Sequence, residues 1–386
     1  MLKIAVIGTG NIAPSHIGAY LTFPERCEIV ALCDIYPEKA EAKKRDFKIE
    51  NAKIYSSHKE MIEDIGGELD LVSVCTPPFT HSEIAIDFLR AGVNVIVEKP
   101  MASSLAECDL MLKAEKESGK TLAVIAQNRF TDPYMKLKSV LDSGMIGRVL
   151  HAEINSYWWR GHCYYDLWWR GAWATEGGGC TLNHAVHHID MLGWMLGTPE
   201  KVTAVLSNAA HDNAEVEDIS VAAMQYPGGT LAQVTSSVIH HGEEQAVIIQ
   251  GERARVSAPW KVYASLSREN GFPIRNESLE AEICEYYDSL PPLKYSGHTA
   301  EIDDVMRALE TGGRPFIDGV SGRRTIEIIT AIYKSGFEGR TVTLPLAADD
   351  PFYTVDGIQK NVRHFYEKTT SVNNFTDESI TVGGSK

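Results

Sequence analysis

The strongest constraint on the fold is an alternation of short apolar runs with stretches of helical pattern over the first third of the chain. The apolar runs occupy residues 2–7, 28–33, 69–75, 94–97 and 121–126, and the helical stretches occupy 11–23, 37–47, 59–65, 81–91 and 105–117. Nearly continuous apolar strands must be buried on both faces, and helices cover the faces of such a sheet. We therefore expect an α/β fold that begins with a doubly wound parallel sheet.

A glycine-rich turn joins the first predicted strand to the first predicted helix. Gly8 and Gly10 are followed by Asn11 and Ile12, and Ala13 stands where many such turns have a third glycine. Gly8 allows the tight turn, and Gly10 lets the backbone approach a pyrophosphate whose charge lies at the positive end of the helix. The combination of strand, turn and helix predicts a dinucleotide-binding Rossmann domain.

The acid that ends the second predicted strand indicates which dinucleotide binds. Asp34 follows the glycine turn by about twenty residues, where a carboxylate accepts hydrogen bonds from the adenosine ribose. The same carboxylate would repel a ribose phosphate, and the next residue is Ile35 rather than a cation. We therefore expect NAD as the cofactor rather than NADP.

Composition excludes several classes of partner. The chain has 386 residues and a formal net charge of -15, with no basic patch, so we expect neither nucleic acid nor a membrane surface as a partner. Seven cysteines lie scattered without a Cys-x-x-Cys pair, which favours free thiols in a reducing compartment. Because the chain opens directly on an apolar strand, we expect no leader segment and a cytoplasmic location.

Beyond about residue 129 the pattern changes to longer runs of β-branched and aromatic residues. Strands are expected over 149–159, 201–207, 219–226, 230–240 and 246–250, with helices over 133–143, from about 185, over 300–311 and over 322–337. They predict an α+β domain with an open, mostly antiparallel sheet, one face of which the last three helices cover. We expect an NAD-binding Rossmann domain at 1–127, a substrate-binding domain at 128–349 whose late helices are able to pack back on the first domain, and a C-terminal extension at 350–386 that wraps a neighbour or frays.

Two segments follow strands of the first domain at the edge where a doubly wound sheet binds its ligand. Thr76, Pro77 and His81 follow one strand, and Glu98 and Lys99 follow another. We expect both segments to border the cofactor. The proline after Lys99 restricts the backbone and favours a fixed position for that lysine.

These residues belong to a wider set of motifs, by which the chain resembles the Gfo/Idh/MocA oxidoreductases, the family of glucose-fructose oxidoreductase and inositol dehydrogenase. Each motif alone is weak, but together they are specific, and the resemblance runs from residue 3 to about residue 346. The motifs are Gly8-x-Gly10-x-x-Ala13, Thr76-Pro77 with His81, Glu98-Lys99-Pro100, Gln127-Asn128-Arg129-Phe130, Gly177-Gly178-Gly179 followed by Asn183 and His187, and the region from Gly319 to Pro345 with Ala331-Ile332-Tyr333.

The resemblance implies dehydrogenation of a secondary alcohol, which needs a hydride acceptor, a base for the hydroxyl proton and a donor to the oxygen. NAD is the acceptor, and Lys99 and His187 flank the reacting carbon; which of them takes the proton stays open. Asn183 stands where many relatives have aspartate, and an amide orients a hydroxyl but cannot act as a base. The full set of expected cofactor contacts is Gly8, Gly10, Asn11, Ile12, Asp34, Thr76, Pro77, His81, Glu98, Lys99 and Asn128.

A metal site is the alternative interpretation of the three histidines at positions 184, 187 and 188. His184 and His187 could share one helix face, but no third ligand with suitable spacing stands out. We therefore expect no metal.

The segment before the glycine triplet is rich in tryptophan, tyrosine and arginine, from Trp158 to Trp173. Some of these aromatics must fill the core, yet the mixture also suits a sugar, whose C–H faces lie on aromatic rings while its hydroxyls take hydrogen bonds. The resemblance implies that this segment and the arginine after Asn128 line the substrate side of the nicotinamide. The contacts it implies for this carbohydrate or cyclitol substrate are Arg129, Tyr165, Arg170, Trp173, Asn183 and His187, with His298 as a further contributor. Neutral aromatics favour a pyranoside, glycoside or cyclitol over a highly charged sugar acid.

Three functions fit these residues. The first is an NAD-dependent dehydrogenase that oxidises a secondary hydroxyl of a sugar, glycoside or cyclitol and releases NADH. The second is a glycoside hydrolase that keeps its NAD and works by oxidation, elimination, hydration and reduction. The third is a non-catalytic regulator that responds to sugar and NAD, which intact Lys99 and His187 disfavour. By resemblance, we also expect a homodimer or homotetramer that pairs through the outer face of the open sheet.

Overall fold

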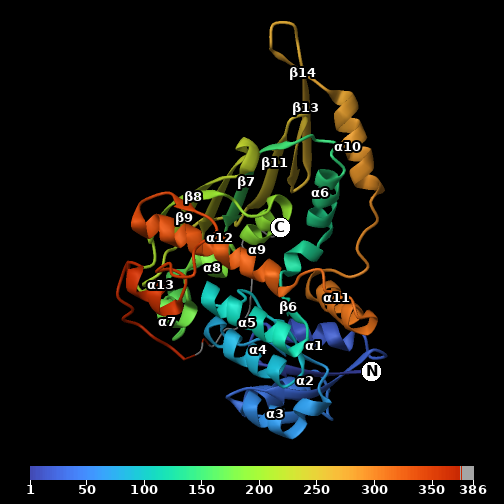
Figure 1. Cartoon of the computed structure of the whole chain (residues 1–386), viewed down its shortest axis with the longest axis vertical. Helices are drawn as coiled ribbons and strands as arrows, with labels where there is room; N and C mark the ends of the chain where they lie inside the picture. The colour runs from blue at the N-terminus through green and yellow to red at the C-terminus, as the bar shows by residue number, and fades with distance from the viewer. Residues whose placement is uncertain (374, 376–386) are drawn as a thin grey trace.

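The computed structural model of the chain describes residues 1–373 and 375, which form two sheets and the helices around them (Figure 1). The first sheet has six parallel strands in the order β3-β2-β1-β4-β5-β6, and helices separate the strands along the chain. This order confirms the predicted Rossmann fold. Its elements are β1 (Leu2–Ile7), α1 (Ala13–Leu21), β2 (Cys27–Cys33), α2 (Pro37–Asp46), β3 (Lys53–Tyr55), α3 (His58–Ile65), β4 (Leu71–Val74), α4 (His81–Arg90), β5 (Asn94–Val97), α5 (Leu105–Ser118) and β6 (Leu122–Val124).

The second sheet has nine strands in the order β14-β13-β12-β11-β7-β10-β9-β8-β15. Only the pair of β7 and β10 is parallel among the described strands of this sheet, so the prediction of a mostly antiparallel sheet is confirmed. Its strands are β7 (Val149–Tyr157), β8 (Lys201–Ser207), β9 (Ile219–Gln225), β10 (Leu231–Ser237), β11 (Gln245–Gly251), β12 (Ala254–Ala258), β13 (Lys261–Ser267), β14 (Pro273–Arg275) and β15 (Val342–Thr343).

The remaining helices cover one face of this sheet or connect it to the first. They are α6 (Asp132–Asp142), α7 (Trp173–Glu176), α8 (Cys180–Asn183), α9 (Val186–Leu196), α10 (Glu277–Ser289), α11 (Gly297–Thr311), α12 (Gly319–Glu338) and α13 (Val355–Asn361). Within the described residues, none of the helices has the length and apolar character needed to cross a membrane.

The two late helices, α11 and α12, pack against different parts of the molecule. α12, orange in Figure 1, contacts β8 and α9 on one side and α5 and β6 on the other, so it joins the two halves of the molecule. α11 instead packs against α1, where Ile302, Val305 and Met306 complete the apolar cluster around Ile17 and Tyr20. The expectation that α11 covers the second sheet is therefore wrong, because its apolar stripe matches the open side of the first core.

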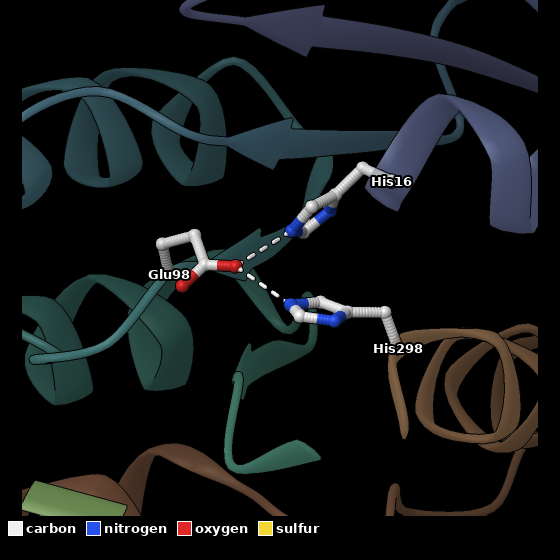
Figure 2. Close-up of side chains that lie close together, drawn as sticks. All are labelled: His16, Glu98 and His298. Carbon is white, nitrogen blue, oxygen red and sulfur yellow. Dashed lines mark hydrogen bonds and ion pairs between the residues drawn. The ribbon is translucent and has the colours of Figure 1, made fainter. Parts of the chain in front are cut away.

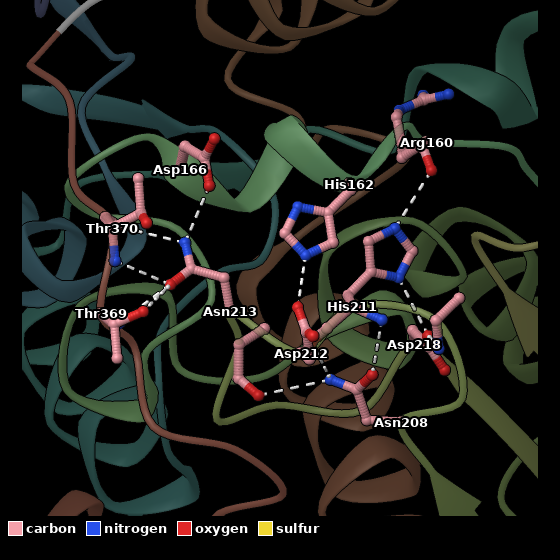
Figure 3. Close-up of polar contacts among 12 residues, drawn as sticks. Arg160, His162, Asp166, Asn208, His211, Asp212, Asn213, Asp218, Thr369 and Thr370 are labelled. Carbon is pink, nitrogen blue, oxygen red and sulfur yellow. Dashed lines mark hydrogen bonds and ion pairs between the residues drawn. The ribbon is translucent and has the colours of Figure 1, made fainter.

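The segment after β15 packs along the chain's own aromatic loop. The side chain of Asn213 donates to Asp166 at 2.8 Å and to the carbonyl of Thr370 at 3.0 Å, and its oxygen accepts from the backbone N–H groups of Thr369 and Thr370 (Figure 3). Val372 then pairs with Leu167 in a parallel bridge. The described part of the predicted extension thus contacts the same chain, next to the loop that we expect to hold the substrate.

We predict that Asn213→Ala lowers the free energy of unfolding by roughly 1–3 kcal/mol, because the buried Asn213 amide makes partly buried hydrogen bonds that join the aromatic loop to the C-terminal segment. Urea denaturation followed by fluorescence measures this change. Asn361→Ala is the matched control: its amide donates only to the carbonyl of Gly357 at an exposed site. Equal effects of the two substitutions would contradict the role of Asn213.

Candidate active site

The glycine turn after β1 has the geometry that a dinucleotide requires. Gly8 has φ +87°, and a Cβ there would lie 2.8 Å from the carbonyl of Cys75, so the position accepts no side chain. At Gly10, by contrast, a Cβ would meet no atom within 4 Å, which leaves open space over the backbone at the start of α1. The turn therefore offers a cradle for a pyrophosphate.

The carboxylate of Asp34 is held beside this turn. One of its oxygens accepts from the backbone N–H of Thr9 at 2.8 Å and from its hydroxyl at 2.9 Å, and the other accepts from the N–H of Tyr36. The neighbouring Ile35 is exposed and carries no charge that could neutralise a ribose phosphate. The residues present at this end of the sheet fit NAD.

The loops after β4 and β5 are joined by a buried histidine. The ring nitrogens of His81 lie 2.7 Å from the carbonyl oxygen of Thr76 and 2.9 Å from that of Pro100. Both nitrogens are therefore used by the backbone, and the side chain acts as a support for the loops that carry Pro77 and Lys99. The prediction that His81 itself contacts the cofactor stays a prediction.

Lys99 and His187 line one small cavity behind the carboxyl ends of β5 and β6, together with Ala126 and Asp190. In the part of the chain that the structure describes, neither the Lys99 ammonium nor the His187 ring makes a hydrogen bond, so both are available to a ligand. Burial and the nearby charge of Lys99 hold the pKa of His187 well below its usual range. Burial also lowers the pKa of Lys99, while the charge of Glu98 opposes this shift.

Asn183 lies four positions before His187, and the two residues belong to different helices. α8 ends at Asn183 and α9 begins at Val186. The Asn183 amide donates to the carbonyl of Gly178 at 2.7 Å and to that of Gly179 at 3.3 Å. Its N–H groups therefore hold the glycine loop, and its carbonyl oxygen is the atom that remains for a ligand.

The glycine triplet is required by close packing against β9 and α12. A Cβ on Gly179 would overlap the backbone carbonyl of Glu217, and a Cβ on Gly178 would overlap the hydroxyl of Tyr333. The Glu217 carboxylate accepts from the N–H groups of Gly179 and Thr181 at 3.1 and 3.0 Å and from the Tyr333 hydroxyl at 3.0 Å. Burial raises the pKa of Glu217 to about 7. This carboxylate fixes the loop that leads to Asn183 and His187.

Glu98 lies at the centre of a buried cluster directly before Lys99 (Figure 2). One carboxylate oxygen lies 2.8 Å from Nε2 of His16 and 3.1 Å from Nε2 of His298, and the other accepts from the backbone N–H of Lys99 at 3.1 Å. The ring nitrogens of His16 and His298 and the carboxylate oxygen of Glu98 lie within 4.8 Å of one another. Glu98 is therefore used inside the protein, whereas we expected it to border the cofactor, and that contact stays a prediction.

Within the aromatic loop, Arg170 forms a group of charged and aromatic side chains. The Arg170 guanidinium binds Glu176 at 2.9 Å and lies over the rings of Tyr164 and Trp169, with centroid distances of 4.2 and 4.1 Å. Tyr164 in turn approaches Nε2 of His184 at 3.4 Å. Arg170 thus belongs to a stacked, partly exposed group, and its charge lowers the pKa of Lys99 after burial has lowered it, which indicates that this group lies near the cavity.

Other expected substrate contacts lie in the interior. Tyr165 is buried against Tyr164 and His211, and Trp173 packs edge-on against Tyr333 and Phe337. These rings hold the loop in place. Direct contact of either residue with substrate stays a prediction, because the atoms that would make it are covered.

Arg129 is also used within the protein. It is only 3% exposed and makes two 2.7 Å hydrogen bonds to Asp190, whose carboxylate also accepts from Thr325. Withdrawing one member of such a buried pair costs about 3–5 kcal/mol, which is more than a typical contact with a sugar hydroxyl returns. The structure therefore gives Arg129 the task of joining the start of the second domain to α9 and α12.

The sequence analysis did not identify two polar residues of this region, His16 and Glu301. His16 lies on the helix that follows the glycine turn, at a position that faces the sheet edge, and Glu301 reaches the backbone N–H of Ala126 at 3.0 Å from α11. A polar residue on the inner face of a helix next to the glycine turn is a usable signal for His16. No local signal identifies Glu301, since its partner lies 175 positions away.

The comparisons with known proteins decide the family. Residues 2–126 match a family model described as the oxidoreductase family with an NAD-binding Rossmann fold, and residues 134–257 match the GFO/IDH/MocA C-terminal domain. The chain belongs to the Gfo/Idh/MocA oxidoreductase family. The predicted membership, enzyme class and NAD cofactor are thereby confirmed. The domain boundaries at 127 and 349 stay predictions.

The chain is similar to members of this family over most of its length. It is 26% identical to myo-inositol 2-dehydrogenase of Thermotoga maritima, over 89% of this chain and 98% of that protein. It is 25% identical to 2,7-anhydro-N-acetylneuraminate hydratase of Mediterraneibacter gnavus, over 88% of this chain and 96% of that protein. The WlbA dehydrogenase from Bordetella pertussis, solved with NADH and UDP-GlcNAcA, has a TM-score of 0.75 and 29% identity, over 90% of this chain and 99% of that one.

We predict that Gly10→Ala weakens NADH binding at least ~10-fold with little change in Tm, because the added methyl group points into open space that the pyrophosphate needs. Gly8→Ala serves for comparison, since its methyl group meets the carbonyl of Cys75 and should lower Tm as well. Fluorescence titration with NADH and thermal melting measure the two effects. Unchanged NADH affinity in Gly10→Ala would contradict this location of the cofactor.

Proposed function

We propose that the protein is an NAD-dependent dehydrogenase that oxidises a secondary hydroxyl of a sugar, glycoside or cyclitol. The observation that carries this proposal is the shared cavity of Lys99 and His187 at the carboxyl edge of the Rossmann sheet. A general base and a hydrogen-bond donor with no partner in the protein are the groups that an alcohol needs there. The relatives that are named inositol and sugar dehydrogenases support the same substrate class.

Lys99 and His187 divide the acid and base work in this proposal. His187 is neutral at neutral pH, because burial and Lys99 lower its pKa, so its ring accepts the hydroxyl proton. Lys99 donates an N–H to the same oxygen and stabilises the negative charge that develops on it. The carbonyl oxygen of Asn183 accepts a hydrogen bond from a neighbouring hydroxyl and so orients the ring. Bound NAD supplies the hydride acceptor.

The substrate ring lies on the stacked group of Arg170, Tyr164 and Trp169 in this proposal. Their aromatic faces suit the C–H face of a pyranose or cyclitol, and the Arg170 guanidinium offers donors to hydroxyl groups. The position of this loop depends on the ion pair to Glu176 and on the packing of the described part of the C-terminal extension.

A redox-neutral reaction on a glycoside is the second candidate. It is favoured by the similarity to a protein named as a hydratase, which is comparable in extent to the similarity to the inositol dehydrogenase. With NAD as the hydride acceptor, the same base would first take the proton of a ring hydroxyl as its carbon is oxidised, after which the acidified neighbouring carbon would lose its proton and the aglycone would depart. Water then adds and the hydride returns to the sugar. Incubation with chromogenic glycosides, with NADH absorbance and aglycone release recorded together, distinguishes the candidates: release without accumulated NADH favours the second.

We predict that Lys99→Met and His187→Leu each lower kcat/KM by about 10²–10⁴-fold on whichever sugar or cyclitol a substrate panel identifies. NADH affinity should stay within about threefold, since neither side chain holds the dinucleotide phosphates. Steady-state kinetics and NADH titration measure both quantities. A Lys99→Met protein that kept full cellular function would favour the non-catalytic regulator instead.

We also infer that two copies pair through the outer face of the nine-stranded sheet. The helices cover the other face, and this face exposes Val205, Val221 and Leu231 at 68%, 44% and 53%. Val205 and Val221 are direct partners on β8 and β9, so their side chains form one apolar patch.

We predict that the double substitution Val205→Asp with Val221→Asp converts the oligomer to monomer, because it introduces unpaired charges at the centre of the contact. Light scattering after size-exclusion chromatography measures the mass. Lys113→Asp, at an exposed position of α5 in the first domain, is a control for the change in surface charge. A monomeric parent protein would refute the pairing outright.

A further inference from the structure

The buried carboxylate of Glu98 collects donors from three distant parts of the chain. His16 comes from α1, His298 comes from α11, and the third donor is the backbone N–H of Lys99 (Figure 2). Glu98 is 4% exposed, and a buried carboxylate with this many donors is held in its ionised form. Although burial alone would raise the pKa of Glu98, the hydrogen bonds from His16 and His298 hold it well below its usual range.

The hydrogen bonds around His16 are complete when its ring is neutral. Its Nε2 donates to Glu98, so its Nδ1 accepts from the hydroxyl of Ser73 at 3.1 Å, and Ser73 accepts from the hydroxyl of Tyr20 at 2.7 Å. Burial lowers the pKa of His16 and favours this neutral form. His16 therefore adds no positive charge beside the Glu98 carboxylate, and its ring needs no ion to complete its hydrogen bonds.

That charge lies next to the lysine of the proposed active site. Burial lowers the pKa of Lys99, the positive charge of Arg170 lowers it further, and Glu98 is the anion that opposes both. The other titratable groups around Glu98 and Lys99 include His81 on α4, His184 after α8, His187 on α9, Glu301 on α11 and the thiol of Cys75 after β4. Burial raises the pKa values of Glu301 and Cys75, so both favour their neutral forms and leave the negative charge to Glu98.

We propose that Glu98 is the positioning residue that keeps Lys99 charged, and that His16 and His298 serve this role by holding the Glu98 carboxylate ionised and fixed. The inference rests on the proposed function, in which the Lys99 ammonium donates to the reacting oxygen. Its consequence is that a C-terminal helix controls the proton on an N-terminal active-site lysine. His298 is the most exposed of the three side chains, at 13% against 5% for Glu98 and 0% for His16.

The charge on Lys99 can be measured without any substrate. We expect the NAD complex, labelled with ¹³C at the lysine Cε, to give a Lys99 resonance that Lys99→Arg removes and whose shift reports its titration. In Glu98→Gln the midpoint should fall by at least ~1 pH unit, because an adjacent opposite charge is lost. The alkaline limb of kcat/KM against pH should move down by the same amount.

Variants of His298 test the other half of the proposal. In His298→Leu the carboxylate loses one donor, so Glu98 should take up a proton at higher pH. The Lys99 resonance reports this protonation as an inflection, and the pH midpoint of that inflection should rise by about one unit. His298→Gln retains an N–H donor and should restore the behaviour of the parent protein. His58→Leu removes a similar histidine, 3.0 Å from Asp87 on the outer surface, and should change nothing.

The outcomes separate this inference from the proposed function. An unchanged Lys99 midpoint in Glu98→Gln, in a protein that still binds NADH and melts cooperatively, overturns the inference. If Glu98→Gln does not fold, an unshifted inflection in His298→Leu overturns it. A shifted midpoint in a protein that is inactive on every sugar and cyclitol supports the charge control and contradicts the dehydrogenase.

Discussion

The buried carboxylate of Glu98 is the constraint on which the arrangement of the two halves depends. A charge that is removed from water must be paired or hydrogen-bonded, and the donors available at this strand end come from α1 and from α11. His298 lies 200 positions beyond Glu98, so the last third of the chain has to return to the first sheet to complete the pairing. The apolar face of α11 gives this return its free energy, because Ile302, Val305 and Met306 are buried against α1.

A second carboxylate plays the matching role on the other side of the cavity. Glu217, on the segment before β9, holds the backbone of Gly179 and Thr181 and the hydroxyl of Tyr333, so it ties the glycine loop to α12. Lys99 is therefore carried by a loop that a buried acid fixes, and His187 follows a glycine loop that a second buried acid fixes, at the start of α9. Loops fixed in this way combine open side chains with rigid backbones, which suits groups that must meet a substrate in one geometry.

The predictions from sequence succeeded where the deciding interactions are local. The strand, turn and helix around Gly8, the acid at Asp34 and the apolar strands of both sheets follow from patterns within about ten to thirty residues, and the structure has them. The short strand β3, the added strands β12 to β14 and the helices α10 and α13 were missed, because they are brief or largely exposed and leave only a weak apolar pattern. The expected substrate contacts of Arg129 and Trp173 stay predictions, and the sequence did not show that Arg129 pairs with Asp190 or that Trp173 packs against Tyr333.

The sequence alone determined the dinucleotide turn and the preference for NAD, because backbone conformation and charge at these positions depend on the residue itself and its near neighbours. Lys99 and His187 were proposed as the reactive pair through the motifs that the chain shares with its family. Only the tertiary structure decided which polar side chains remain open. His16, Glu98 and His298 form one cluster, and Arg129 forms a closed pair with Asp190, because partners for buried charges are chosen by distance in space. The same choice in space decided that α11 completes the first domain and not the second sheet.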